Sequence, residues 1–414
     1  MRGPGATLVF KSFHSHRSCQ LGAADARYSA RETTKVFVPV QFMPAAELMR
    51  CMDVAEYLRR QKENLVEQAK LVKDFSVFEF DYIPDQPLMR EEATRLMDEM
   101  LRFEISGIPT HHVLIGSRGS GKTLSVKFLQ RIMPGHTALE VLYANCREHN
   151  TSFKILAHLL DVQARGASLA ELFQEFCARH AGKTVVLLDE IDLMSPKDPR
   201  REILYLLSRA GQPFMVVALA NNPHVVRSLD PATRSSLQPV PVHFRNYDAE
   251  QINEILKDRA ERGLMRWDQA RLAEIAAMTA KRTNADARVA IKTLYYSVTQ
   301  PGEELVACFE RARRDVVVDM IHDLSDATLA ILWAVRSAPT DFAKDIYARY
   351  CRFCQGRSEK PFSYVHFYSN LSYLQSVGLV ALVSTKVAKT YANRVVLSFE
   401  EAVVDQICRL RFEQ

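Results

Sequence analysis

A run of eight residues, Gly-Ser-Arg-Gly-Ser-Gly-Lys-Thr at positions 116–123, constrains the fold of this chain more than any other feature. It follows the apolar run 113–115 and precedes the helical pattern 124–129, which is the strand–loop–helix setting of a phosphate-binding loop. Glycines let backbone N–H groups turn toward phosphate oxygens, and the start of a helix adds partial positive charge. The expected phosphate-binding residues are Gly116, Ser117, Arg118, Gly119, Ser120, Gly121, Lys122 and Thr123. Lys122 is suited to the β- and γ-phosphates of a nucleoside triphosphate, and the Thr123 hydroxyl to Mg²⁺.

A second segment predicts hydrolytic chemistry. Residues 184–188 form an uninterrupted apolar run that ends in Asp189 and Glu190, as expected of a strand buried in a parallel sheet. An aspartate at the end of such a strand can hold Mg²⁺, and the glutamate beside it can orient and deprotonate an attacking water. We therefore expect Asp189 to be a metal ligand and Glu190 to be a catalytic residue.

Apolar runs alternate with helical stretches through the first half of the chain, which predicts an α/β fold with a parallel sheet and helices on both faces. The expected strands are 113–115, 139–145, 184–189, 215–220 and 240–244. The ligand should lie at the carboxyl edge of this sheet. The expected domains are a basic, partly disordered arm with a charged helix at 1–74, a nucleotide-binding core at 75–246, a helical lid at 247–320 and a winged-helix domain at 321–414.

Two further polar residues stand where they could report on the terminal phosphate. Asn221 follows the apolar run 215–220, and a strand placed between the other two motifs would bring it to the γ-phosphate. Arg288 begins the helical pattern 289–298 of the lid, from where a guanidinium could close onto the phosphate with a bidentate fork. An asparagine turn and an ordinary exposed arginine remain the alternatives for these two positions.

The order of these motifs resembles the AAA+ replication initiators. This family unites the largest subunit of the origin recognition complex, the eukaryotic helicase-loading ATPase and their merged archaeal counterparts. The resemblance rests on the phosphate loop, Leu-Leu-Asp-Glu-Ile-Asp at 187–192, Leu-Ala-Asn at 219–221, Asp-Ala-Arg at 286–288 and the winged-helix pattern. It extends to Phe-Asp-Tyr-Ile-Pro-Asp at 80–85, Leu-Met-Arg-Glu at 88–91 and Phe-Arg-Asn-Tyr at 244–247.

The resemblance implies an AAA+ core that binds ATP and Mg²⁺ and hydrolyses ATP slowly. It assigns Asn221 and Arg288 as the first and second sensors of the nucleotide. The further nucleotide-binding residues that it implies are Tyr82, Pro84, Arg90 and Tyr247. Eukaryotic large subunits carry an arginine that acts on a neighbour's ATP at the position of Ser236, so Arg234 is the candidate for that role here.

Three short helical patterns followed by two β-rich runs, 379–383 and 395–399, predict a winged helix. In such domains the third helix enters the major groove of DNA and the hairpin tip meets the backbone. The expected DNA-binding residues are Ser363, Tyr364, His366, Lys386, Lys389 and Arg394. Because the charge of this domain is close to neutral, binding of a protein instead of DNA remains the alternative.

Together these features predict a replication initiator that binds double-stranded DNA at origins. Its expected partners are other origin-complex or helicase-loader subunits and the replicative helicase. The alternatives are a nucleotide-stabilised scaffold and an AAA+ ATPase of mitochondrial or transposition type. No apolar stretch approaches the ~20 residues of a membrane helix, so no membrane partner is expected. The basic, acid-poor segment 1–35 favours a disordered arm and a nuclear location, with a mitochondrial presequence as the alternative.

Overall fold

The computed structural model describes residues 70–163, 166–195, 197–300, 302–336, 342–387 and 390–412, together with a few isolated positions between 55 and 66. The chain divides into two units, 1–62 and 63–414. All elements described below belong to the second unit. The predicted arm at 1–35 lies outside the described residues, and so does most of the predicted charged helix at 45–73.

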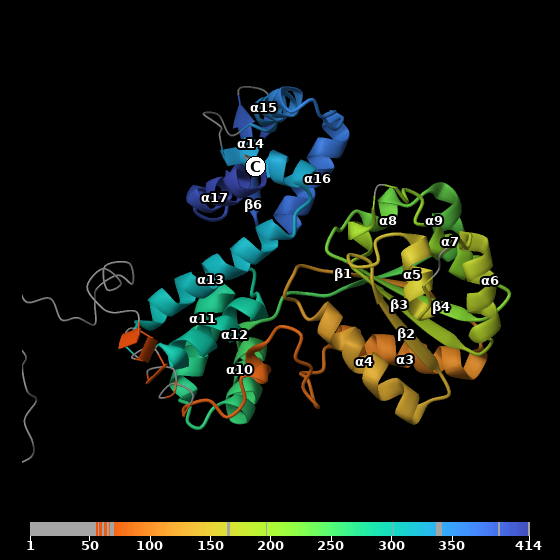
Figure 1. The fold of residues 1–414 in the computed structure, drawn as a ribbon, viewed down its shortest axis with the longest axis horizontal. Coiled ribbons are helices and arrows are strands. Elements are labelled where there is room, and N and C mark those ends of the chain that lie inside the picture. Colours follow the sequence, from red (N-terminus) through yellow and green to blue (C-terminus); the bar gives the residue numbers. More distant parts are fainter. Residues whose placement is uncertain are drawn as a thin grey trace, which may run out of the picture. The chain divides into compact units, whose positions relative to one another are not determined.

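A parallel five-stranded sheet forms the centre of the predicted nucleotide-binding core (Figure 1). Its strands are β1 (His112–Ile115), β2 (Glu140–Asn145), β3 (Thr184–Asp189), β4 (Phe214–Ala220) and β5 (Val240–His243). Their spatial order is β2-β3-β4-β1-β5. All five strands predicted from the sequence are present, and β4 lies between the strand before the phosphate loop and the strand that ends in Asp189.

Alternate residues of the buried strands face two different apolar layers. Val185 and Leu187 pack with the helices α3 (Glu91–Ser106) and α4 (Lys122–His136). Val186 and Leu188 pack on the other face, against α5 (Ser152–Leu159), α6 (Leu169–Arg179) and α7 (Glu202–Arg209). The helices thus cover both faces of the sheet, and the expected fold class is confirmed (Figure 1).

Short elements complete the core. They are the 3₁₀ helices η2 (Ser76–Phe78) and η3 (Ile191–Leu193) and the helices α8 (Val225–Ser228) and α9 (Pro231–Leu237). Although η2 precedes the sheet in sequence, Val77 and Phe78 are buried against the lid helices.

The lid consists of α10 (Ala249–Gly263), α11 (Gln269–Arg282), α12 (Ala287–Thr299) and α13 (Leu305–His322). A capping box begins α10: Asp248 accepts from the Gln251 backbone N–H, and the Gln251 side chain accepts from that of Asp248. The sequence Asp-Ala-Glu-Gln at 248–251 has the spacing typical of such a cap. Ile252, Leu256 and Ala260 recur at helical spacing on α10 and are buried in the lid core.

The C-terminal region has the helices α14 (Asp326–Arg336), α15 (Ala343–Gly356) and α16 (Tyr364–Ser376). An antiparallel hairpin of β6 (Val380–Val387) and β7 (Thr390–Leu397) follows, and α17 (Glu401–Phe412) comes last. This layout is consistent with the predicted winged helix, but α17 is not among the elements predicted from the sequence. The apolar core of this region is continuous with α13, since Phe309 and Val316 pack with Leu329 and Leu371.

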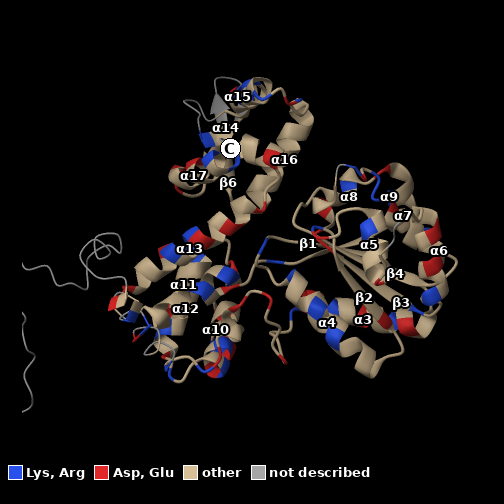
Figure 2. Ribbon diagram, in the orientation of Figure 1, with Lys and Arg blue, Asp and Glu red and all other residues tan. Residues whose placement is uncertain are grey.

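Charged side chains lie mainly on the helices, and the strands of the large sheet are almost free of them (Figure 2). Helix α13 carries both basic and acidic residues (Figure 2). Across the part of the chain that the structure describes, no helix combines the length and apolarity needed to span a bilayer.

Candidate functional site

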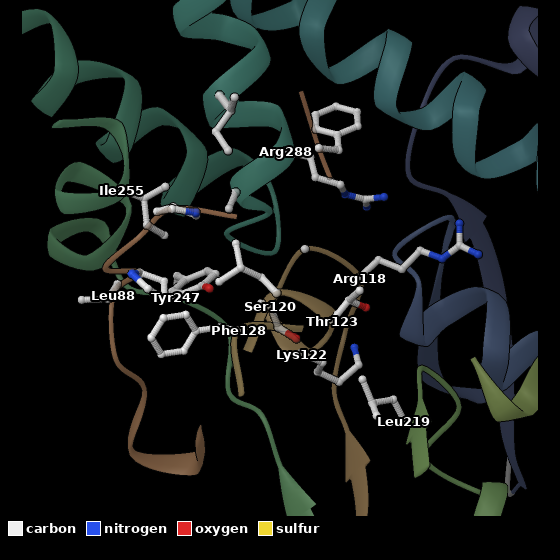
Figure 3. A pocket seen from close by; sticks show the side chains of 18 of the residues that line it. Leu88, Arg118, Ser120, Lys122, Thr123, Phe128, Leu219, Tyr247, Ile255 and Arg288 are labelled. Atoms are coloured by element: carbon white, nitrogen blue, oxygen red, sulfur yellow. The ribbon is translucent and has the colours of Figure 1, made fainter. Parts of the chain in front are cut away.

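A cavity of about 770 Å³ opens at the carboxyl edge of the sheet. Its walls come from residues 80–89, the phosphate loop and the start of α4, the ends of β3 and β4, and the lid helices α10 and α12. One side is mainly apolar, with Leu88, Phe128, Tyr247 and Ile255 gathered together (Figure 3). The other side carries Arg118, Lys122, Thr123 and Arg288 (Figure 3). The cavity therefore offers a nonpolar end for a base and a cationic end for phosphates.

The phosphate loop forms the floor of the cationic end. Residues 118–123 line the cavity, whereas Gly116 and Ser117 lie behind it, where their carbonyls accept from Lys122 Nζ at 2.8 and 2.9 Å. Gly119 has a φ of +75°, and a β-carbon there would stand 2.0 Å from Asp286 Oδ1. Gly121 has a φ of +86°, and a β-carbon there would stand 2.0 Å from Tyr247 Oη. Only glycine satisfies both constraints, so the loop packs closely against the residues that lead into the lid.

Lys122 is buried, which disfavours its charged form. Burial lowers the pKa of the Lys122 ammonium to about 8, against the opposing effect of Asp189 and Asp192. A phosphate bound beside this ammonium would favour the charged form, because an opposite charge a few ångströms away stabilises it.

The two acids at the end of β3 differ in their surroundings. Asp189 is buried, and its carboxylate accepts from Tyr143 Oη at 3.0 Å and from the Glu190 backbone N–H at 2.9 Å. Glu190 has a left-handed backbone with a φ of +53°, a strained conformation for a residue with a side chain. Burial raises the pKa of the Glu190 carboxyl, and Asp189 adds to the effect. Hard oxygen ligands from Asp189 and Thr123 beside a phosphate loop fit Mg²⁺.

Asn221 stands at the end of β4, directly beside the phosphate loop. Its side-chain oxygen accepts from Lys122 Nζ at 3.0 Å. The backbone N–H groups of Asn221 and Asn222 both donate to Asp192 Oδ2, at 3.1 and 3.0 Å. Asp192 therefore positions the turn that presents Asn221 to the cavity.

Arg288 reaches the cavity from the first turn of α12. Its guanidinium forms a two-point ion pair with Asp286, with Nη2–Oδ2 at 2.5 Å and Nε–Oδ1 at 3.0 Å. Asp286 also caps α12 by accepting from the Arg288 backbone N–H at 3.0 Å. The lid arginine is thus held at the helix start by a neighbouring carboxylate.

The residues expected near the base divide into two groups. Pro84 and Tyr247 line the cavity. Arg90 is buried behind it: its guanidinium lies 4.5 Å from the centre of the Tyr247 ring and donates to the Arg245 carbonyl at 2.8 Å. The Tyr82 ring is likewise covered by Arg259, at 4.5 Å. Arg90 and Tyr82 therefore support the cavity wall and do not form its surface.

Arg234 does not belong to the residues that line the cavity. It is exposed on α9, and Ser236, two residues later, pairs with Ser208 through their hydroxyl groups at 2.8 Å. An action on a neighbouring subunit is compatible with this exposure and stays a prediction.

The expected DNA-binding residues lie in the C-terminal region, apart from the cavity lining. Ser363 caps α16, and Tyr364, His366 and Arg394 are exposed. Lys389 and the side chain of Lys386 lie outside the described residues.

Three acids that position the site have no role in the expectations drawn from the sequence. Asp192 and Asp286 lie within the motifs at 187–192 and 286–288, so their positions in these motifs could have indicated a role at the site. No motif indicated Asp323, because its partner Arg118 is 205 residues earlier in the chain.

The fold and this cavity define a nucleotide-binding ATPase of the AAA class. The model of the family "ATPase family associated with various cellular activities" matches residues 112–243, which span all five strands. The structure of the Aeropyrum pernix ORC1 protein in complex with DNA superimposes with a TM-score of 0.60 and 24% identity, covering 82% of this chain and 97% of that one. The A. pernix ORC2 protein gives a TM-score of 0.56 at 23% identity, with 83% of this chain and 100% of that one covered. These two likenesses concern the fold.

Sequence relatives give the family. The ORC1-type DNA replication protein 1 of Sulfolobus acidocaldarius is 32% identical over 268 residues, which cover 59% of this chain and 67% of the relative. The ORC1-type DNA replication protein of Desulfurococcus amylolyticus is 25% identical over 349 residues, with 75% and 87% covered. The chain belongs to the ORC1-type DNA replication proteins, and the expectation of an AAA+ replication initiator is confirmed.

The same relatives correct one expectation. They come from archaea, whose cells have no nucleus. The expected nuclear location is therefore wrong, because a basic, acid-poor segment at 1–35 does not distinguish a nuclear arm from other basic tails. A cytoplasmic or nucleoid location fits these relatives better.

Proposed function

We propose that the cavity binds ATP together with Mg²⁺, and that slow hydrolysis of this ATP switches the protein between a DNA-binding and a released form. The observation that carries the proposal is the convergence of Lys122, Glu190, Asn221 and Arg288 on one cavity from four separate elements. A scaffold with a structural nucleotide would not need Glu190, whose carboxyl group lines the phosphate end beside Asp189.

Each residue has a distinct task in this proposal. Backbone N–H groups of the phosphate loop and the Lys122 ammonium hold the phosphates, and Thr123 and Asp189 would ligate Mg²⁺, which neutralises charge on the phosphate oxygens. Glu190 orients a water and accepts its proton, and its raised pKa suits a general base. Asn221 and Arg288 contact the terminal phosphate. Because Asp286 holds Arg288 at the start of the lid helix α12, a contact between Arg288 and the phosphate would couple nucleotide binding to the position of the lid.

The base fits the apolar end. Leu88, Phe128, Tyr247 and Ile255 supply nonpolar surface, and Arg90 fixes the Tyr247 ring from behind. Because Ile255 comes from the lid and Phe128 from the core, a bound base would contact both parts.

The C-terminal region is proposed to bind duplex DNA at replication origins. A relative of the same fold has been solved in complex with DNA. The start of α16 exposes Tyr364 and His366, which can reach phosphates or base edges, and the hairpin exposes Arg394. With sister subunits of an origin complex or helicase loader, the protein would help to load the replicative helicase, and Arg234 would act on the ATP of a neighbour.

A second function for this region has one specific observation in its favour. Helix α16 carries no Lys, Arg, Asp or Glu, and Val365 on it is 76% exposed. An uncharged helix with an exposed aliphatic side chain suits contact with a protein surface.

The decisive experiment is a salt titration of duplex-DNA binding by fluorescence anisotropy, with ATP, ADP or no nucleotide. Tighter binding with ATP than with ADP, and a steep salt dependence, are expected. Lys122→Ala should remove the difference between ATP and ADP. Salt-independent binding, or none in any nucleotide state, would refute the DNA-binding role and favour the protein-binding alternative.

A further inference from the structure

Arg118, the third residue of the phosphate loop, has hydrogen-bonding capacity that the described residues leave unused. Its side chain is 8% exposed, and its Nη1 pairs with Asp323 Oδ2 at 3.2 Å. Its Nε and Nη2 are buried and have no hydrogen-bond partner of good geometry among the described residues, although the buried Tyr373 side chain of α16 lies close to the guanidinium. Because buried guanidinium donors are costly to leave unpaired, this arrangement points to a further anionic partner.

The guanidinium faces the phosphate end of the cavity. Arg118 lines the cavity on the same side as Lys122 and Arg288 (Figure 3). Glu190 and Asp323, the ion-pair partner of Arg118, line the same cavity. Since Glu190 is the residue proposed to orient the attacking water, Arg118 stands on the side of the terminal phosphate and away from the base.

In this structure the anionic partner of Arg118 is the Asp323 carboxylate. Asp323 follows the last turn of α13 and lines the cavity itself. It also forms an ion pair with Arg147. A carboxylate and a phosphate present similar oxygen pairs to a guanidinium, so the two compete for the same donors. Arg147 also pairs with Asp323, but unlike Arg118 it does not line the cavity.

We infer that Arg118 is a ligand of the terminal phosphate of the bound nucleoside triphosphate, and that Asp323 competes with this phosphate for it. The inference rests on the proposed function of the cavity and adds a residue that distinguishes ATP from ADP within a single chain. Asp323 follows α13, and α13 shares an apolar core with the C-terminal helices. Release of Arg118 from Asp323 would therefore occur where the lid joins the C-terminal region.

The test compares the affinities of the full chain for ADP and for the slowly hydrolysed analogue ATPγS, each with Mg²⁺, by isothermal titration calorimetry. Arg118→Ala should weaken ATPγS binding about 10- to 100-fold, the loss expected for hydrogen bonds between charged groups, and should change ADP binding by less than about threefold. Asp323→Asn should tighten ATPγS binding and leave ADP binding unchanged, because a neutral amide competes less well for the guanidinium.

Arg147→Ala is the matched control, because it removes the other ion pair of Asp323 and should leave the ATPγS-to-ADP ratio unchanged. Arg118→Lys, which keeps the charge without the fork, replaces Arg118→Ala if that variant does not fold, and should also lose ATPγS affinity selectively. Equal losses for both nucleotides, or no loss, in the Arg118 variants would overturn the inference. If the unaltered chain binds neither nucleotide, the proposed function itself fails.

Discussion

Lys122 Nζ donates a hydrogen bond to Asn221 Oδ1 over 3.0 Å, which joins the phosphate loop to the end of β4. The contact exists because β4 is the immediate neighbour of β1 in the sheet, with Ile115 in register with Ala220. The lysine that should bind the phosphates and the amide that should sense them therefore share one hydrogen bond. A change at either residue is expected to affect the other.

Lys122→Ala should abolish measurable ATP binding. The ammonium is a buried cation at the floor of the cavity, and the loss of two or more hydrogen bonds to charged phosphate oxygens corresponds to an affinity loss of roughly 100-fold or more. Equilibrium binding of a fluorescent ATP analogue would measure it, with Lys154→Ala on the surface of α5 as the control. Retained affinity would show that this loop does not hold the phosphates.

ATP affinity should depend on pH in a defined direction. The pKa of Lys122 is lowered by burial to about 8 in the free protein, and bound phosphates should raise it again. Above pH 8 the complex then binds more protons than the free protein, so affinity should fall as pH rises, by up to about tenfold per pH unit. Below pH 8 it should be flat.

Lys122→Arg is the control for this pH profile, because a guanidinium stays protonated throughout the range. Its affinity for ATP can be lower, but it should not vary between pH 7 and 9.5 as that of the unaltered chain does. An identical slope in the variant would assign the pH dependence to another group.

Glu190→Gln should preserve ATP binding and lower the steady-state hydrolysis rate by at least about 100-fold, the usual contribution of a general base. The amide keeps the size of the side chain but cannot accept a proton. Phosphate release and nucleotide affinity would be measured on the same preparation. Undiminished turnover would remove Glu190 from the catalytic role.

Asp192→Ala should destabilise the turn that holds Asn221. It leaves the backbone N–H groups of Asn221 and Asn222 buried without their common acceptor, at a cost of about 2–4 kcal/mol. Asp192→Asn should cost less, because its amide oxygen still accepts. Hydrogen exchange of these two amides, followed by mass spectrometry, is expected to be faster in the alanine variant; unchanged protection would mean that Asp192 is dispensable for the turn.

The elements of the fold could be read from the sequence because their signals are local. Apolar runs marked every strand of the sheet, and those of β3 and β4 are followed by the acids and the amide of the site. The helix α17 was not predicted because it carries several charged residues and its apolar periodicity is weak.

The interior of the site was predictable only in part. Lys122, Asp189, Glu190, Asn221 and Arg288 are all found at the cavity, since each stands at the end of an element whose position follows from the sheet. Partners that depend on tertiary packing gave no signal. The stacking of Arg90 behind Tyr247 joins residues on two different segments, and only the folded chain brings them together.

Reversing the charge of Lys386, Lys389 and Arg394 to glutamate should weaken duplex-DNA binding. If each side chain contacts one phosphate, the slope of log affinity against log salt should become shallower by roughly 2–3, because each contact releases about 0.9 counterion. The matched control reverses Arg95, Arg102 and Lys257, which are exposed on α3 and α10 and change the net charge equally. Long-range repulsion of DNA by the added negative charge would lower the affinity of both triple variants. A loss of affinity that both share would therefore not locate the DNA-binding site. A shallower slope in the hairpin variant alone would place the phosphate contacts on β6, β7 and their connection, whereas equal slopes in both would move the DNA-binding surface elsewhere on the protein.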